Sequence, residues 1–296
     1  MQLSIFAQPI ETQLKWLKSS GMEVQNEEAA LLFLERNGLY RLSHYYKHYF
    51  KNSEAEHFKE GTSFEKIQLI YNCDHSIRHW ILDEMEHIEL YVRQYINSAM
   101  VTAYGPYWIE REELFEERYL FEKNLRHLSK DYIRNDEDFI QAERNNVPGN
   151  LPPSWIALEV SSFGTLSSLF DNLKNSKEKT KIAKHFGVNE KYFSSWLHSL
   201  SHVRNQAAHF TRLWNDTFNV HISIPKTTSF KWVNNLHFAD NRVYAYLCVI
   251  AFIRNIMDKN WNAGEQLKSI LSRCEEVNES AYGFPYDWAE EAIWTN

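Results

Sequence analysis

Apolar residues recur at three- and four-residue steps along most of the chain, which is the period of an α-helix. The longest such stretch, residues 63–103, predicts one very long helix or two helices in series. A helix pair kinked near Phe163 is expected at 155–173, and Asn26 and Asn189 are suited to cap the helices that follow them. The other expected helices cover residues 13–17, 27–36, 112–134, 177–186, 190–215, 241–259 and 264–274.

Segments without a helical period divide the chain. Residues 38–50 are strongly aromatic and their secondary structure is ambiguous, residues 51–61 are polar and predict a loop or linker, and residues 221–225 predict a short extended piece. A polar excursion runs from Gly105 to Asn150. We therefore predict an all-α fold with a helical and aromatic N-terminal region over residues 1–60. A helical domain over 61–296 follows, with a helical insertion at about 105–150.

The composition is that of a globular protein that can build a large core. Hydrophobic residues make up 44% of the 296 residues and aromatic residues 15%, whereas there are only 9 glycines and 7 prolines. The longest apolar run, residues 244–256, is shorter than the ~20 residues that span a bilayer. Because the N-terminus also lacks the pattern of a secretion signal, we expect a cytoplasmic protein without membrane contact.

Charge and cysteine content narrow the expected partners. The formal net charge of −7 argues against non-specific binding to bulk nucleic acid, so no DNA partner is expected and any RNA contact must be local. Cys73, Cys248 and Cys274 are widely spaced and predict packing residues. His198 and His202 have the spacing of metal ligands on a helix, but no carboxylate nearby completes the set. We expect neither a metal nor another cofactor.

The predicted helix at 190–215 has two faces on a helical wheel. The apolar face comprises Phe193, Trp196, Leu200, Val203, Ala207, Phe210 and Trp214. The opposite stripe comprises His198, His202, Asn205, His209 and Arg212, with Arg204 beside it. A polar stripe of this kind is usually a solvated face. Histidines in place of Lys and Glu, however, also suit proton transfer near neutral pH.

The stripe could cleave RNA without a metal, since RNA supplies its own nucleophile, the 2′-hydroxyl. His209 would move the proton, Arg204 would stabilise charge on the phosphate, and Asn205 would bind the phosphate or the imidazole. Arg204 lies about 140° around the helix from His209. A homodimer that brings two such helices together would solve this geometry, and the small Ala207 and Ala208 would permit their close approach.

Residues 204–209, Arg-Asn-Gln-Ala-Ala-His, are followed by Arg212-Leu213-Trp214-Asn215. This pattern resembles the signature of the Abi-like (abortive infection, AbiD/AbiF-type) family, which belongs to the HEPN superfamily of ribonucleases. Further blocks resemble the family in the same order along the chain, at residues 40–45, 71–74, 88–93, 151–159, 163–166 and 282–288. Two positions depart from the family pattern. Phe210 stands where many members have a second histidine, and His44 stands where glycine is usual.

The resemblance implies a helical HEPN domain and a metal-independent endoribonuclease of a phage-defence or toxin–antitoxin system. Arg204, Asn205 and His209 take the motif positions, and RNA is the implied substrate. A small noncoding RNA or a protein antitoxin is the implied kind of inhibitor. A different class stays open beside the enzyme, a catalytically inactive HEPN-type module that binds RNA or protein, and a helical scaffold is a weaker third hypothesis.

Several other residues have two interpretations each. Glu89 and Arg93 form either a surface ion pair or a support for the motif helix, and His202 and Arg212 are expected to support the motif as well. Lysines at 174, 177, 179, 181 and 184 precede the motif helix; Lys177, Lys181 and Lys184 are the candidate RNA contacts, against a merely solvated helix. In the aromatic block, Tyr40 and Arg41 are expected to contact RNA bases, and the alternative is that the aromatic rings pack into the core.

Overall fold

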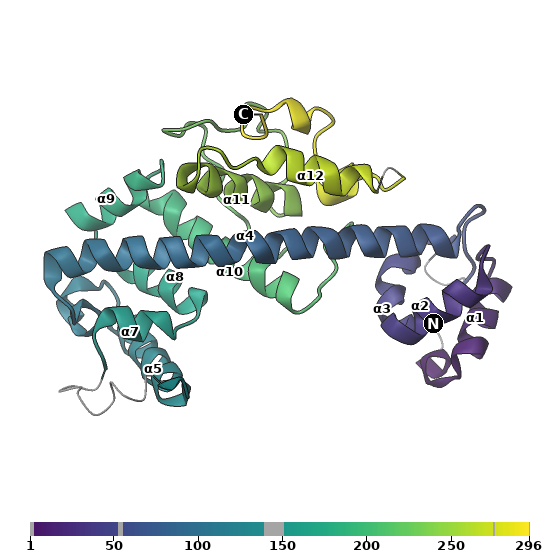
Figure 1. The fold of residues 1–296 in the computed structure, drawn as a ribbon, viewed down its shortest axis with the longest axis horizontal. Coiled ribbons are helices and arrows are strands. Elements are labelled where there is room, and N and C mark those ends of the chain that lie inside the picture. Colours follow the sequence, from purple (N-terminus) through teal and green to yellow (C-terminus); the bar gives the residue numbers. More distant parts are fainter. Residues whose placement is uncertain (1–2, 53–55, 139–150, 275, 296) are drawn as a thin grey trace.

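The computed structural model describes residues 3–52, 56–138, 151–274 and 276–295. Over these residues the protein consists of eleven α-helices and several short 3-10 helices, and its only β-type pairings are isolated bridges (Figure 1). The predicted all-α fold is confirmed. No helix within the described ranges is both long and apolar enough to cross a membrane.

Helix α4 (Phe64–Tyr104) is the central element and runs along most of the length of the molecule (Figure 1). It is one continuous helix of 41 residues, about 60 Å long at 1.5 Å per residue. The Ser63 side chain accepts a hydrogen bond from the Lys66 amide and caps its start. Ile77, Ile81 and Ile88 are completely buried. These three residues lie on one face of α4, which therefore faces the core formed with the other helices.

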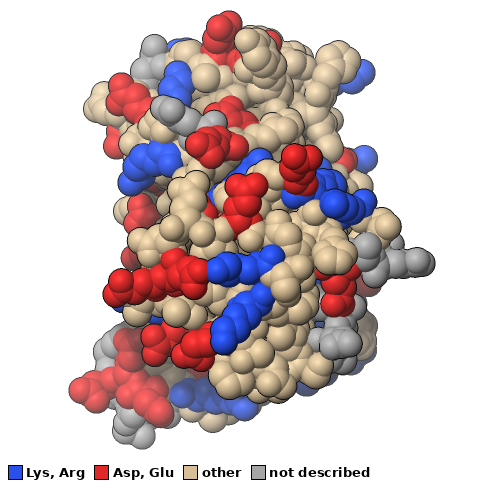
Figure 2. Space-filling view, turned by 90° about the vertical axis from the view of Figure 1, so that its right-hand side faces the viewer, with Lys and Arg blue, Asp and Glu red and all other residues tan. Residues whose placement is uncertain are grey.

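The N-terminal helices gather at one end of α4 (Figure 1). They are η1 (Leu3–Ala7), α1 (Ile10–Ser19), α2 (Glu27–Asn37), α3 (Leu39–Tyr46) and η2 (Lys47–Tyr49). Asn26 caps α2, as predicted, by accepting a hydrogen bond from the Ala29 amide. The ambiguous aromatic block is helical, and Tyr45 and Tyr46 are buried in the core. On the face at this end of the molecule, acidic and basic side chains are interspersed (Figure 2).

The other end of α4 is covered by η3 (Trp108–Glu110), η4 (Glu112–Leu114), α5 (Arg118–Arg134), α7 (Ser154–Glu159), α8 (Phe163–Asn172) and α9 (Lys177–His185). The helix expected over 112–134 begins only at Arg118, after the separate turn η4. The kinked pair is two helices, broken at residues 160–162. Residues 139–150, within the expected insertion, lie outside the described residues.

The last helices complete the core around α4, with α11 (Val243–Met257) and α12 (Ala263–Ser272) above it in Figure 1 and α10 (Glu190–Ala208) crossing it. The short 3-10 helices η5 (Glu279–Tyr282) and η6 (Trp288–Glu290) follow α12. Helix α11 is buried from Val243 to Ile253, which explains why its sequence is apolar on all sides. The three cysteines are buried and unpaired, so their prediction as packing residues is confirmed. The extended piece expected at residues 221–225 forms no strand.

Candidate functional site

The motif helix α10 is shorter than its apolar pattern predicted. Asn189 caps its start by accepting a hydrogen bond from the Tyr192 amide, but the helix ends at Ala208. His209 is its C-cap residue, and its amide still donates to the Asn205 carbonyl at 2.9 Å. Phe210 then has a φ of 59°, in the left-handed region that ends many helices. The predicted continuation to residue 215 is therefore wrong.

A buried carboxylate on α4 holds the segment after the motif in this non-helical path. The Asp74 side chain accepts hydrogen bonds from the Leu213 amide at 3.1 Å and from the Trp214 amide at 2.8 Å. It also accepts one from the Tyr45 hydroxyl at 2.7 Å and forms a buried ion pair with Arg78. Four donors therefore satisfy Asp74, which is completely buried. In a helix these two amides would instead bond to carbonyls four residues earlier.

The new path changes where Phe210 and Trp214 lie. The prediction that Phe210 lies on the apolar face of the helix is wrong. Its side chain is 59% exposed. Arg41 of α3 donates a hydrogen bond to the Phe210 carbonyl at 2.9 Å, and its guanidinium lies 5.6 Å from the centre of the Phe210 ring. Trp214 is buried, but beyond the helix, where its ring stacks on that of Tyr49. The N-terminal region thus contacts the motif segment directly.

Arg204 is anchored by a carboxylate on α4. Its Nε lies 3.0 Å from Glu89 Oε1, and its Nη1 donates to Asn205 Oδ1 at 3.3 Å. The Glu89 side chain is 13% exposed, against 44% for Arg204. Burial raises the pKa of Glu89, whereas the Arg204 and Arg93 guanidinium groups act in the opposite direction. The alternative prediction, an ion pair of Glu89 with Arg93, is not what the structure shows. Arg93 instead donates a hydrogen bond to the Ser161 carbonyl.

An open cleft of about 380 Å³ lies in front of this ion pair. Side chains of α4 form one wall and the end of α10 forms the other. The cleft is lined by Leu82, Met85, Glu86, Glu89, Leu90, Arg93, Arg204 and Ala208. Ala208 faces the cleft, but Ala207 is buried in the core, so the two alanines do not form one exposed surface for a second helix as expected.

His209 is exposed at the end of α10, and neither of its ring nitrogens has a hydrogen-bond partner among the described residues. His202, two turns earlier, lies against the Phe218 ring at 5.5 Å, and its Nε2 lies 3.5 Å from the Gln206 amide nitrogen. Burial and, secondly, the neighbouring His198 lower the pKa of His202. Of these histidines, His209 is the one whose ring is free at the motif.

Arg212 is turned towards the N-terminal region. It donates to the His44 carbonyl and contacts His48 Nε2, and it lies 3.6 Å from Asp216. Sequence reasoning named Arg212 but missed the two histidines of α3 and η2 beside it. The available signal was the family block at residues 40–45, which includes His44 but gives no indication of what it faces.

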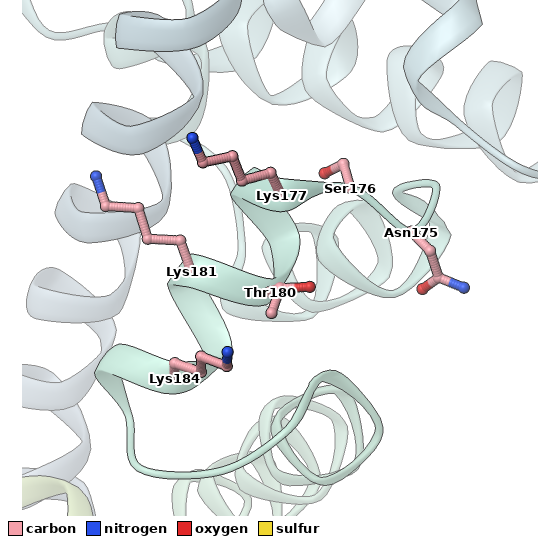
Figure 3. Close-up of a pocket in the computed structure, with 6 residues that line it drawn as sticks. All are labelled: Asn175, Ser176, Lys177, Thr180, Lys181 and Lys184. Atoms are coloured by element: carbon pink, nitrogen blue, oxygen red, sulfur yellow. The ribbon is translucent and has the colours of Figure 1, made fainter.

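The basic helix α9 lies at the far end of α10 from His209, about 27 Å away along a helix of 19 residues. Lys177, Lys181 and Lys184 line a hollow of about 570 Å³ together with Asn175, Ser176 and Thr180. Lys177 and Lys181 extend towards α4 on one side of α9 (Figure 3). These lysines therefore lie apart from His209, and their contact with RNA stays a prediction. Lys179 is buried and bonds the Asp171 and Leu173 carbonyls.

Among the described residues, no three His, Cys, Asp or Glu side chains are grouped as metal ligands would be. The fold and the site define a class of all-α proteins that expose an Arg-Asn-x-x-x-His motif at the end of a core helix. The family model of the Abi-like proteins matches residues 32–215, and the chain belongs to this family. No curated protein and no solved structure matches the chain.

Proposed function

We propose that the protein is a metal-independent endoribonuclease of the HEPN type that acts in abortive infection. Membership of the Abi-like family supports the biological role. The observation that carries the chemistry is the end of α10, where Arg204, Asn205 and the free ring of His209 are exposed beside an open cleft. These side chains supply a proton carrier, a cation and an amide within two helical turns.

In the proposed reaction the 2′-hydroxyl of RNA attacks the adjacent phosphorus. His209 transfers a proton, the Arg204 guanidinium stabilises the negative charge that builds on the phosphate oxygens, and Asn205 orients the phosphate. The products are a 2′,3′-cyclic phosphate and a 5′-hydroxyl. Glu89 holds the guanidinium of Arg204 in a fixed position before the substrate binds, which reduces the entropy lost on binding. RNA is the substrate, and no cofactor takes part.

We also propose that the active form is a homodimer. Arg204 and His209 are five residues apart, about 140° around α10, and Arg204 is bound to Glu89 inside the cleft. The exposed Leu90 on the cleft wall gives a second copy an apolar contact. Across the dimer axis, Arg204 of one protomer would approach His209 of its partner. A noncoding RNA or a protein antitoxin that covers the cleft would keep such an enzyme silent.

The test is incubation of the purified wild type and of His209→Ala with a pool of structured and single-stranded RNAs in EDTA, followed by mapping of the ends. Cyclic phosphates are expected from the wild type and none from His209→Ala. His198→Ala is a matched control, an exposed histidine on the same helix three turns earlier. Undiminished cleavage by His209→Ala would refute the mechanism. Bound but intact RNA with wild type and variants alike would instead support a binding module without catalysis.

A further inference from the structure

Cleavage of RNA by its 2′-hydroxyl needs two proton transfers, and each copy of the motif supplies one histidine. A proton leaves the 2′-oxygen as it attacks, and another must reach the 5′-oxygen as it departs. A single group can perform both only by moving between the two oxygens. A second proton-transfer group beside His209 in the same protomer would complete the pair, an inference that rests on the proposed ribonuclease function.

Two contacts bring α3 against the segment that carries His209. Arg41 of α3 donates to the carbonyl of Phe210, the residue after His209. Three residues further along α3, the carbonyl of His44 accepts a hydrogen bond from Arg212, which lies two residues after Phe210. The segment that follows His209 is thus bonded to His44 and to the residue one turn before it, so the two histidines lie on adjoining segments.

Of the two histidines in this part of the N-terminal region, only one is free to meet a substrate. The His48 ring is engaged on both sides, by Arg212 at Nε2 and by Asn215 at Nδ1. The His44 side chain is exposed, and its ring packs edge-on against Tyr40. Neither ring nitrogen of His44 has a hydrogen-bond partner within the described part of the chain. His44 therefore shares with His209 the exposure and the free nitrogens of a proton carrier.

We propose that His44 is the general base of the reaction and that His209 is the general acid. His44 takes the proton of the 2′-hydroxyl while the bond from the 2′-oxygen to phosphorus forms. His209 gives its proton to the 5′-oxygen while the bond from phosphorus to that oxygen breaks. One proton is taken up and one is released, so the products are the cyclic phosphate and the 5′-hydroxyl with no co-reactant.

The charges around His44 suit this assignment. Burial and, after it, the cations Lys47, Arg212 and Arg41 lower the pKa of the ring, while Asp216 acts in the opposite direction. The imidazole is thus neutral at pH 7, which is the form that accepts a proton. The same cations attract the phosphate on which the reaction takes place.

The test uses the RNA that the wild type cleaves best, made in two forms that differ at the cleaved linkage. One has the natural 5′-oxygen and the other has sulfur in its place, a leaving group that departs without being protonated. On the oxygen form we expect His44→Ala and His209→Ala each to slow cleavage about 100-fold or more, the usual effect of losing an acid or base. On the sulfur form His209→Ala should recover and His44→Ala should stay slow.

His48→Ala is the matched control, since His48 is a neighbour in the same cluster, and its rate should stay near that of the wild type. His44→Gln, checked for its fold by circular dichroism, should behave like His44→Ala. A wild-type cleavage rate for His44→Ala, or recovery of this variant on the sulfur form, would each overturn the proposal. Binding is measured with uncleavable 2′-deoxy RNA, and a loss of His44→Ala activity that weaker binding explains entirely would overturn it too. Slow His44→Ala beside active His209→Ala would instead overturn only the role of His209, and an inactive wild type would overturn both.

Discussion

Asp74 fixes the path of the motif segment, and replacing it by asparagine tests that role. The substitution keeps the shape of the side chain but removes the charge, so Arg78, whose side chain is only 2% exposed, is left without its counter-ion. Removing one partner of a buried ion pair costs about 3–5 kcal/mol. The amides of Leu213 and Trp214 lose a charged acceptor as well, and hydrogen bonds to charged groups contribute about 1.5–3 kcal/mol each. Because these contributions overlap, we expect a total loss of about 3–5 kcal/mol in the free energy of unfolding.

The assay is urea unfolding at 25 °C, followed by circular dichroism. Asp83→Asn is the matched control, an exposed aspartate on the same helix, and should change the free energy of unfolding by no more than about 0.5 kcal/mol. Adding Arg78→Met to Asp74→Asn should recover part of the loss, because no unpaired charge is then buried. RNA cleavage should fall in both Asp74 variants, since the segment that follows His209 is released. A loss below about 1 kcal/mol for Asp74→Asn, the size of one ordinary hydrogen bond, would refute this reasoning.

Two further substitutions test the cleft and the C-terminal packing. Glu89→Gln should slow RNA cleavage by freeing Arg204, while changing the free energy of unfolding by less than about 1 kcal/mol because Arg204 is 44% exposed. Glu86→Gln, in the same cleft, is the control and should cleave RNA at the wild-type rate. Equal cleavage rates for the two variants would contradict the anchoring role of Glu89. Gly264→Ala should destabilise the fold by about 1–3 kcal/mol in urea unfolding, since its Cβ would lie 2.0 Å from the Trp294 carbonyl oxygen. Unchanged stability of this variant would contradict the close packing at that position.

The helices could be predicted because their information is local. The apolar period of α4 and the capping residues Asn26 and Asn189 lie within or next to the helices that they define. The aromatic block was ambiguous for the opposite reason. Tyr45 and Tyr46 are buried through contacts made by the whole N-terminal region, which no short window of sequence contains.

The end of α10 could not be predicted, because the residue that fixes it lies 139 positions away from Leu213 in the chain. The apolar period continues through Phe210 and Trp214, so the local pattern favours a longer helix. The buried Asp74 overrides this local pattern by accepting hydrogen bonds from two backbone amides of the segment. For the same reason the wheel placed Phe210 in the core, whereas the structure exposes it. Long-range hydrogen bonds decided both outcomes.

The ion pairs show a similar limit. A spacing of four residues indicated a pair of Glu89 with Arg93, whereas the family resemblance implied that Glu89 supports the motif helix. The structure joins Glu89 to Arg204, 115 positions away. The lysines of α9 lie at the opposite end of α10 from His209, and their contact with RNA stays a prediction. Residue type predicted which side chains are charged. Their partners depended on the packing of α4 against α10.

The position of α3 explains how a chain with a net charge of −7 can present a cationic site. The residues that match the Abi-like family begin within α2 and end at Asn215, and the segments near the two ends of this range contact each other. Arg41 and Lys47 from the N-terminal region meet Arg212 from the motif segment around His44. The positive charge that the proposed RNA substrate requires is thus assembled by tertiary contact. A sum over the sequence does not reveal it, and in the proposed mechanism the N-terminal region supplies part of the site.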